Sequence, residues 1–226
     1  MPKPHREWDR DVMASLVSEK RLSTYLVATD GVLETAFELY AWNIRLAGAI
    51  LNATAMVEVV VRNSIDHTLT AWNDSRNRCE DWFDMPILDR RAKEDVAKVR
   101  ARIERRGSAP DHDKIIAELS FGFWRFLTSR RYLASIWVPA LHNAFPYGDS
   151  DLRKRQQETA RLLGNMNFLR NRAAHLEPVF RRNLTKDIAE ARCLMSWVNS
   201  EALLWFDDTL KIDNILSAKP RPPFRQ

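Results

Sequence analysis

Two segments of the chain repeat the pattern Arg-Asn-x-x-x-His. The first copy comprises Arg62, Asn63 and His67, and the second comprises Arg170, Asn171 and His175. The chain has only five histidines among 226 residues, so composition alone makes a chance repetition improbable. Histidine exchanges protons near neutral pH, and arginine offers a planar pair of donors to a phosphate that gains charge in a transition state. RNA supplies its own nucleophile, the 2′-hydroxyl, so such a set could cut RNA without a nucleophilic Ser or Cys and without a metal.

The second copy falls on a segment with a clear helical pattern. Its apolar stripe consists of Leu162, Met166, Leu169, Ala173 and Leu176. Asn171 and His175 are four residues apart, so they share a helix face, and at 100° per residue this face points away from the stripe. We therefore expect Asn171 and His175 to be exposed, while Arg170 lies on an adjacent face and could reach the same phosphate. We assign Arg170, Asn171 and His175 as catalytic candidates. The basic residues Arg172, Arg181 and Arg182 beside them are assigned to RNA binding.

The first copy lies in an almost wholly apolar segment. Its predicted stripe consists of Ile50, Ala53, Val57, Val60 and Ser64, and His67 continues it. Glu58 and Arg62 are four apart and could form a buried ion pair. This pattern favours a structural role for Glu58, Arg62, Asn63 and His67. A second catalytic role is the alternative, because the motif itself is repeated.

Helices must position these residues, because the chain has few glycines and long stretches without glycine or proline. No alternating pattern of strands competes. The helices are expected at 8–28, 32–72 (with a break possible near Gly48), 89–106, 111–129, 132–145 and 149–177, and from Asn183 or Thr185 onward. The sequence thus predicts an all-α bundle of about six or seven helices in a single domain over 1–216, followed by a disordered basic tail over 217–226.

Composition restricts the class of protein further. The formal charge of +5 comes mainly from arginine and is compatible with a nucleic-acid partner. Cys79 and Cys193 lie far apart without metal-ligand spacing, which indicates a reducing compartment and argues against a zinc site. The first residues are charged, and no apolar stretch approaches the roughly 18 to 20 residues of a membrane span. We expect a cytoplasmic protein without a membrane partner.

Two further segments each have two interpretations. The charged segment 89–106 reads either as a solvated helix face, which we favour, or as a surface that follows RNA phosphates. The aromatic side chains of Phe121, Phe123 and Trp124 could stack on bases, but a core role is favoured.

Three separated segments resemble the Abi-like (abortive infection) proteins of the HEPN superfamily. They read VEVVVRNSIDH at 57–67, ELSFGFWRFL at 118–127 and FLRNRAAHLEPVF at 168–180. The hallmark of that superfamily is an Arg and a His about four to six residues apart, often with a polar residue after the Arg. The resemblance extends from about residue 30 to residue 200.

The resemblance implies a HEPN-like helical bundle that dimerises so that two motifs face each other. It implies a metal-independent endoribonuclease without a cofactor, acting in phage defence or as a toxin, with an antitoxin protein or RNA as a further partner. Its catalytic set falls on Arg170, Asn171 and His175. Either the first motif faces the second within one subunit, or a second copy of the chain supplies the facing motif, which we favour because two full bundles are hard to fit in 226 residues. A non-catalytic HEPN-type module that binds RNA or protein is the alternative.

Overall fold

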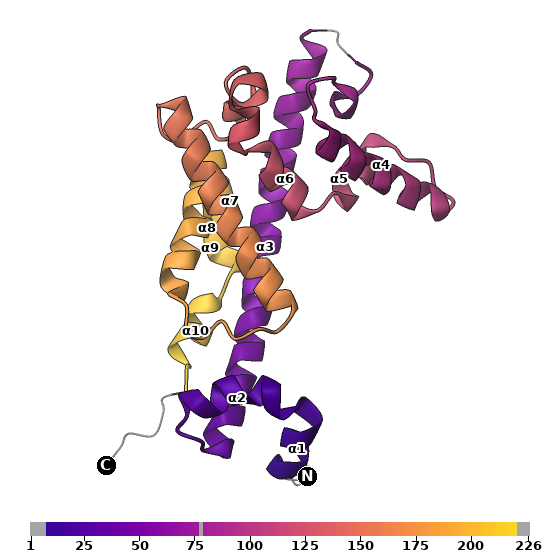
Figure 1. The fold of residues 1–226 in the computed structure, drawn as a ribbon. Helices are drawn as coiled ribbons and strands as arrows, with labels where there is room; N and C mark the ends of the chain where they lie inside the picture. The colour runs from indigo at the N-terminus through magenta and orange to yellow at the C-terminus, as the bar shows by residue number, and fades with distance from the viewer. Residues whose placement is uncertain (1–7, 77–78, 221–226) are drawn as a thin grey trace, which may run out of the picture. The chain divides into compact units, whose positions relative to one another are not determined.

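The computed structural model describes residues 8–76 and 79–220, and within these ranges the chain is helical with no strand (Figure 1). This confirms the all-α class. The described residues contain ten α-helices, more than the six or seven expected. Three predicted helices are each divided by a capping residue, and a further short helix, α10 (Ile212–Ser217), follows near the end of the chain.

Contacts divide the chain into two compact units. The first unit contains the residues up to Leu51, residues 172–182 and the residues from Lys211 onward. The second contains Asn52–Asn171 and Asn183–Leu210. The single domain expected over 1–216 stays a prediction.

The first unit contains α1 (Arg10–Val17), α2 (Glu19–Ala28), the beginning of α3 (Leu33–Asp74) and α10 (Ile212–Ser217). Its core consists of Leu22, Tyr25, Trp42, Leu46, Phe180 and Ile212. The indole Nε1 of Trp42 donates to the carbonyl of Ile215 at 2.6 Å, which ties α10 to α3. Lys219 also donates to the Phe180 carbonyl at 2.9 Å. Residues 217–220 of the expected disordered tail belong to the described part of the chain, and 221–226 lie outside it, so the disordered tail stays a prediction.

The second unit contains the rest of α3, the 3-10 turn at Trp82–Asp84, and α4 (Arg90–Arg105), α5 (His112–Glu118) and α6 (Phe121–Leu127). It continues with 3-10 and π turns at 130–144, most of α7 (Leu152–Ala174), α8 (Leu184–Val198) and α9 (Ser200–Thr209). Large side chains of its core include Trp82, Phe83, Phe123, Trp124, Trp137 and Phe145, all nearly inaccessible. Phe121 is buried with them, so the favoured core role of the aromatic segment is confirmed.

Serine and asparagine caps explain the divided helices. Ser18, with a φ of 78°, ends α1 and caps α2, so the segment 8–28 forms two helices. The hydroxyl of Ser120 accepts from the Phe123 amide at 3.3 Å, which starts α6 and separates it from α5. Asn199 divides the last predicted helix into α8 and α9 in the same way. A side-chain cap offers the backbone an alternative to continuing the preceding helix.

Two other expectations about helices are corrected. The segment 132–145 forms 3-10 and π turns rather than an α-helix. By contrast, α3 passes Gly48 without a break. A side chain at Gly48 would meet no atom within 4 Å, so neither close packing nor a turn requires glycine there.

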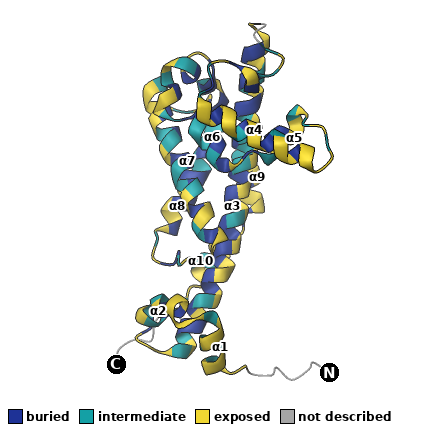
Figure 2. Cartoon of the chain, turned by 45° about the vertical axis from the view of Figure 1, so that its right-hand side comes forward, coloured by how far each residue is buried: buried dark blue, intermediate teal, exposed yellow. Residues whose placement is uncertain are grey.

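The charged helix α4 has one buried face. Asp89 caps it, and its buried residues are Ala92, Val96, Val99 and Ile103. Its other residues are largely exposed (Figure 2). Arg100 pairs with Asp84, and both Arg102 and Arg106 pair with Glu118 of the ELSFGFW segment. These ion pairs fit the solvated-face interpretation and secure α4 to its neighbours within this unit.

By length and composition, α3 could cross a membrane, which corrects the expectation that no segment is long and apolar enough. In its most apolar 18-residue window, 44% of the residues are buried inside the protein. The core helix of a soluble protein passes the same test. This finding therefore establishes neither a membrane span nor a location.

Candidate active site

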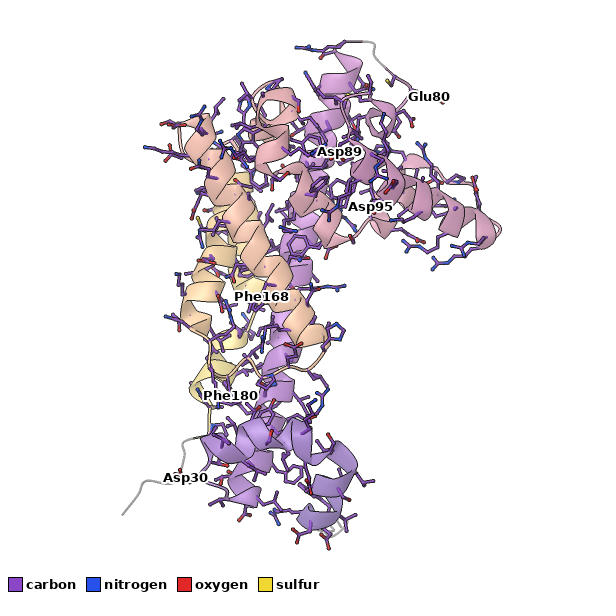
Figure 3. All side chains as sticks on the ribbon, in the orientation of Figure 1. Asp30, Glu80, Asp89, Asp95, Phe168 and Phe180 are labelled. Atoms are coloured by element: carbon purple, nitrogen blue, oxygen red, sulfur yellow. The ribbon has the colours of Figure 1, made fainter. Side chains whose placement is uncertain are left out.

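The second motif lies where α7 ends. Arg170 and Asn171 belong to the second unit and His175 to the first, because α7 passes from one unit into the other after Asn171. All three side chains are exposed, which for Asn171 and His175 confirms the expectation from the helical angles. Phe168, one turn earlier on α7, is also 44% exposed (Figure 3).

The end of α7 is built by a Schellman turn. The Leu176 amide donates to the Ala173 carbonyl at 3.0 Å, and the Glu177 amide donates to the Arg172 carbonyl at 2.9 Å. Leu176 adopts a φ of 49°, the left-handed conformation that this turn requires. The helix therefore ends at Ala174, three residues before the Glu177 boundary that Pro178 suggested. His175 is the capping residue directly after the helix, and its ring is accessible.

Buried groups of the first unit hold the chain after this turn. Asn43, which is fully buried, donates to the Glu177 carbonyl at 3.3 Å and accepts from the Val179 amide at 2.9 Å. Because a buried amide left without partners is costly, Asn43 fixes the path of this segment. The segment that follows His175 is thus firmly anchored within its unit.

The same contact joins Arg and Asn in both motifs. A guanidinium nitrogen of Arg170 donates to the Asn171 side-chain oxygen at 3.4 Å, and Arg62 donates to Asn63 at 3.3 Å. In each copy the asparagine orients its arginine neighbour. This gives the asparagine a positioning role in addition to the face-sharing with histidine that its spacing predicted.

Glu58 interacts electrostatically with one arginine of each motif, Arg62 and Arg170, and all three residues belong to the second unit. Burial raises the pKa of the Glu58 carboxyl, and the charges of Arg170 and Arg62 offset this only in part. Arg170 therefore acts on the same half-buried carboxyl as Arg62. Within the described residues no ion pair within 4 Å joins Glu58 to Arg62, so the buried pair that their spacing allows is not formed. Instead, the carboxyl lies in the field of two guanidinium groups.

The prediction that His67 continues the buried stripe is wrong, because its side chain is exposed. From Val57 the buried stripe advances in steps of four to Val61, Ile65 and Leu69. This phase turns His67 outward, where it lines a pocket of about 450 Å³ with Thr68, Ala71, Trp72, Pro139, Ala140 and Asn143.

Other residues of the first motif are structural. The Ser64 hydroxyl donates to the Ala144 carbonyl at 2.8 Å, and Ile65 is fully buried. Asp66 is buried as well and accepts a hydrogen bond from the Trp82 indole at 2.8 Å. The middle of the motif is thus packed into the core, while Arg62, Asn63 and His67, for which a structural role was favoured, are partly or fully accessible, and that role stays a prediction.

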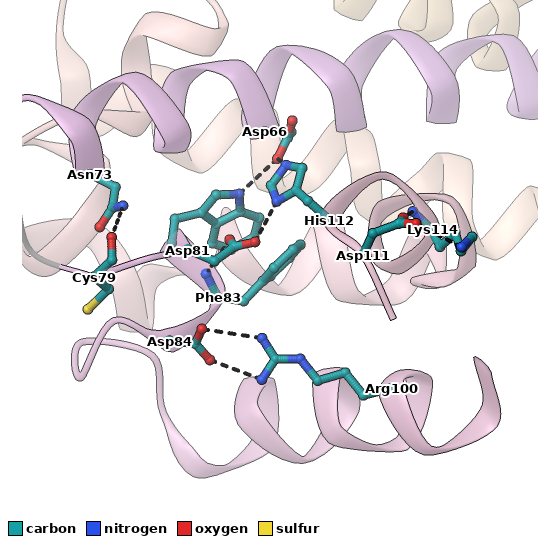
Figure 4. Close-up of polar contacts among 11 residues, drawn as sticks. Asp66, Asn73, Cys79, Asp81, Phe83, Asp84, Arg100, Asp111, His112 and Lys114 are labelled. Carbon is teal, nitrogen blue, oxygen red and sulfur yellow. Dashed lines mark hydrogen bonds and ion pairs between the residues drawn. The ribbon is translucent and has the colours of Figure 1, made fainter. Parts of the chain in front are cut away.

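His112 lies between two carboxylates beside this motif (Figure 4). No pattern in the sequence indicated this cluster. The ring nitrogens of His112 contact Asp81 at 2.6 Å and Asp66 at 3.1 Å. Burial lowers the pKa of His112, but the hydrogen bond and charge of Asp81 and the charge of Asp66 outweigh it, so the pKa is raised from 6.5. Distant parts of the chain meet here, so no local spacing could reveal the cluster.

The three arginines assigned to RNA binding have different surroundings. Arg172 pairs with Glu177 at 3.3 Å and donates to the Pro178 carbonyl at 3.1 Å, so it braces the turn after α7. Arg181 is exposed, with its guanidinium 5.5 Å from the Phe180 ring centre. Arg182 is half-buried. Arg181 is thus the most accessible of the three to a ligand.

Comparison of the chain with protein-family models, curated proteins and solved structures gave no match. In the described part of the chain, no group of three or more His, Cys, Asp or Glu side chains is arranged to hold a metal ion.

Proposed function

We propose that this protein is a metal-independent endoribonuclease of the HEPN type, acting in the cytoplasm in phage defence or as a toxin. The supporting observation is the exposed Arg170, Asn171 and His175 set, an intact motif at a firmly anchored helix end. The resemblance of three segments to Abi-like proteins supplies the class of activity.

In the proposed reaction the 2′-hydroxyl oxygen of RNA attacks the adjacent phosphorus, and the bond from phosphorus to the 5′-oxygen breaks. The products are a 2′,3′-cyclic phosphate and a 5′-hydroxyl. His175 exchanges the proton, either taking it from the 2′-hydroxyl or giving it to the leaving oxygen. Arg170 stabilises the charge that develops on the phosphate, and Asn171 orients Arg170.

A homodimer belongs to the same proposal, because the superfamily pairs two motifs across an interface. Apolar side chains accessible next to the motif residues are consistent with a protein surface there. Val59, beside Glu58, is 40% exposed, and Phe168, near Arg170, is 44% exposed. Such residues become buried when partner surfaces meet.

The test is cleavage of end-labelled RNA in EDTA by the wild-type protein, His175→Ala and His67→Ala. We expect His175→Ala to abolish cutting while His67→Ala retains it, because the proposed catalytic set consists of Arg170, Asn171 and His175. Arg153→Ala removes another exposed arginine of α7 and serves as the control. Binding of RNA by a wild-type protein that does not cut it would favour the non-catalytic module.

A further inference from the structure

A pocket of about 340 Å³ lies in the first unit, between the start of α2 and the turn after α7. It is lined by Ser18, Lys20, Arg21, Thr24, Leu176, Glu177 and Pro178. This volume falls within the range of about 300 to 1,000 Å³ that is usual for ligand sites. The turn after α7 that forms one wall is the turn that begins at His175.

The charged groups of this pocket favour an anion. Lys20 and Arg21 are exposed cations, and Ser18 and Thr24 add hydroxyl groups that can bind phosphate oxygens. The Glu177 carboxylate is the opposing charge, but it is paired with Arg172 at 3.3 Å. The balance of unpaired charge around the pocket is therefore positive.

Arg21 connects the pocket to the candidate histidine. Its Nη1 donates to the Leu176 carbonyl at 3.3 Å and lies 3.5 Å from the His175 carbonyl. These bonds occupy one nitrogen of the guanidinium, so its other donors can serve a ligand. A phosphate held by Arg21 would lie next to the backbone of His175.

The backbone on both walls is strained. Three non-glycine residues in the described part of the chain have a positive φ, and two of them, Ser18 at 78° and Leu176 at 49°, line this pocket. Residues held in such conformations tend to gather at binding and active sites. The strain is independent of the charge pattern and marks the same place.

We propose that this pocket binds a phosphodiester of the RNA backbone that flanks the cleaved bond, with Lys20 and Arg21 as the cationic contacts. The inference rests on the proposed function, because it assigns this pocket to binding the RNA substrate beside His175. It gives the segment before residue 30 a role in substrate binding.

The test is the affinity for a fluorescent 2′-O-methyl RNA, which cannot be cut, as a function of salt concentration. Lys20→Ala should weaken binding about fivefold at moderate salt and should lower the slope of log Kd against log salt by about 1. Lys20→Arg should retain the wild-type slope. Lys211→Ala, another exposed lysine of the same unit, is the control and should leave both values unchanged.

Wild-type affinity and slope in Lys20→Ala would overturn the proposed pocket, and so would a wild-type protein that does not bind this RNA. Cleavage measured in parallel separates the two proposals. Loss of affinity in Lys20→Ala with no cutting by the wild-type protein would keep the phosphate site and reject the ribonuclease. Cutting that depends on His175, together with unchanged binding by Lys20→Ala, would keep the ribonuclease and reject the phosphate site.

Discussion

Replacing His112 by glutamine removes a histidine that joins two carboxylates. The variant loses the ring contacts to Asp81 at 2.6 Å and to Asp66 at 3.1 Å. Asp66 is only 6% exposed, and it then keeps the Trp82 indole as its described donor. The difference in free energy of unfolding between the wild-type protein and the variant therefore measures how much His112 stabilises the protein by neutralising the buried Asp66 carboxylate.

The size of the loss follows from these contacts. A hydrogen bond to a charged group contributes about 1.5 to 3 kcal/mol, and His112 makes two such contacts. Its side chain is 33% exposed, so solvent screens part of the interaction. We expect a net loss of about 2 kcal/mol near pH 6, which corresponds to about 4 to 8 °C in Tm for a domain of this size.

The loss should depend on pH because the pKa of His112 is raised above 6.5 in the folded protein. Stabilisation by the charged ring is complete below the ordinary pKa and is lost as pH rises through the raised one. Urea unfolding of the wild-type protein and His112→Gln should therefore differ more at pH 6 than at pH 9.

The control is His142→Gln. His142 contacts the Trp137 carbonyl at 3.0 Å rather than a carboxylate, so its replacement removes a histidine that joins no carboxylates. A cost of replacing His112 that is the same at pH 6 and pH 9 would refute the charged cluster.

Three further substitutions test other parts of the structure. Glu58→Gln should gain stability over the wild type as pH rises from 4 to 7 in urea titrations, because burial raises the pKa of Glu58 and its ionised form is costly; a constant difference would contradict this. Trp124→Ala should lose about 3 to 5 kcal/mol in the same assay, since the indole is fully buried, and a loss below about 1 kcal/mol would place it outside the core. Ser18→Gly should raise Tm slightly by relieving a φ of 78° at little capping cost, whereas Ser18→Ala should lower it; the opposite order would show that the conformation is not strained.

Local signals in the sequence predicted the fold class and several helix ends. Asp111 caps its helix as expected, and of the two candidates Asn183 and Thr185 the cap of the last long helix is Asn183, because a cap depends on residues within one turn. Ser18 and Ser120 were not predicted as caps, because each lies inside a segment with a continuous helical pattern. A capping serine and a serine in mid-helix look alike in one sequence.

The phase of α3 could not be predicted for a related reason. Val59, Val60 and Val61 are consecutive, so their apolar character fits several helix faces, and only the packed structure shows that Val61 is the buried one. That phase determines whether His67 is buried or exposed. The contact of Asp66 with His112 and the electrostatic interaction of Glu58 with Arg170 join distant segments, so they follow from tertiary packing and not from spacing.

The most direct test of the central claim is the chemistry of the cut ends. RNA incubated in EDTA with the wild-type protein should yield 2′,3′-cyclic phosphate and 5′-hydroxyl ends, and a 2′-deoxy nucleotide before the cut should prevent the reaction. Arg170→Ala and His175→Ala should each abolish it, while Arg153→Ala should leave it unchanged. Cutting that survives in His175→Ala, or that proceeds without the 2′-hydroxyl, would contradict the proposed ribonuclease.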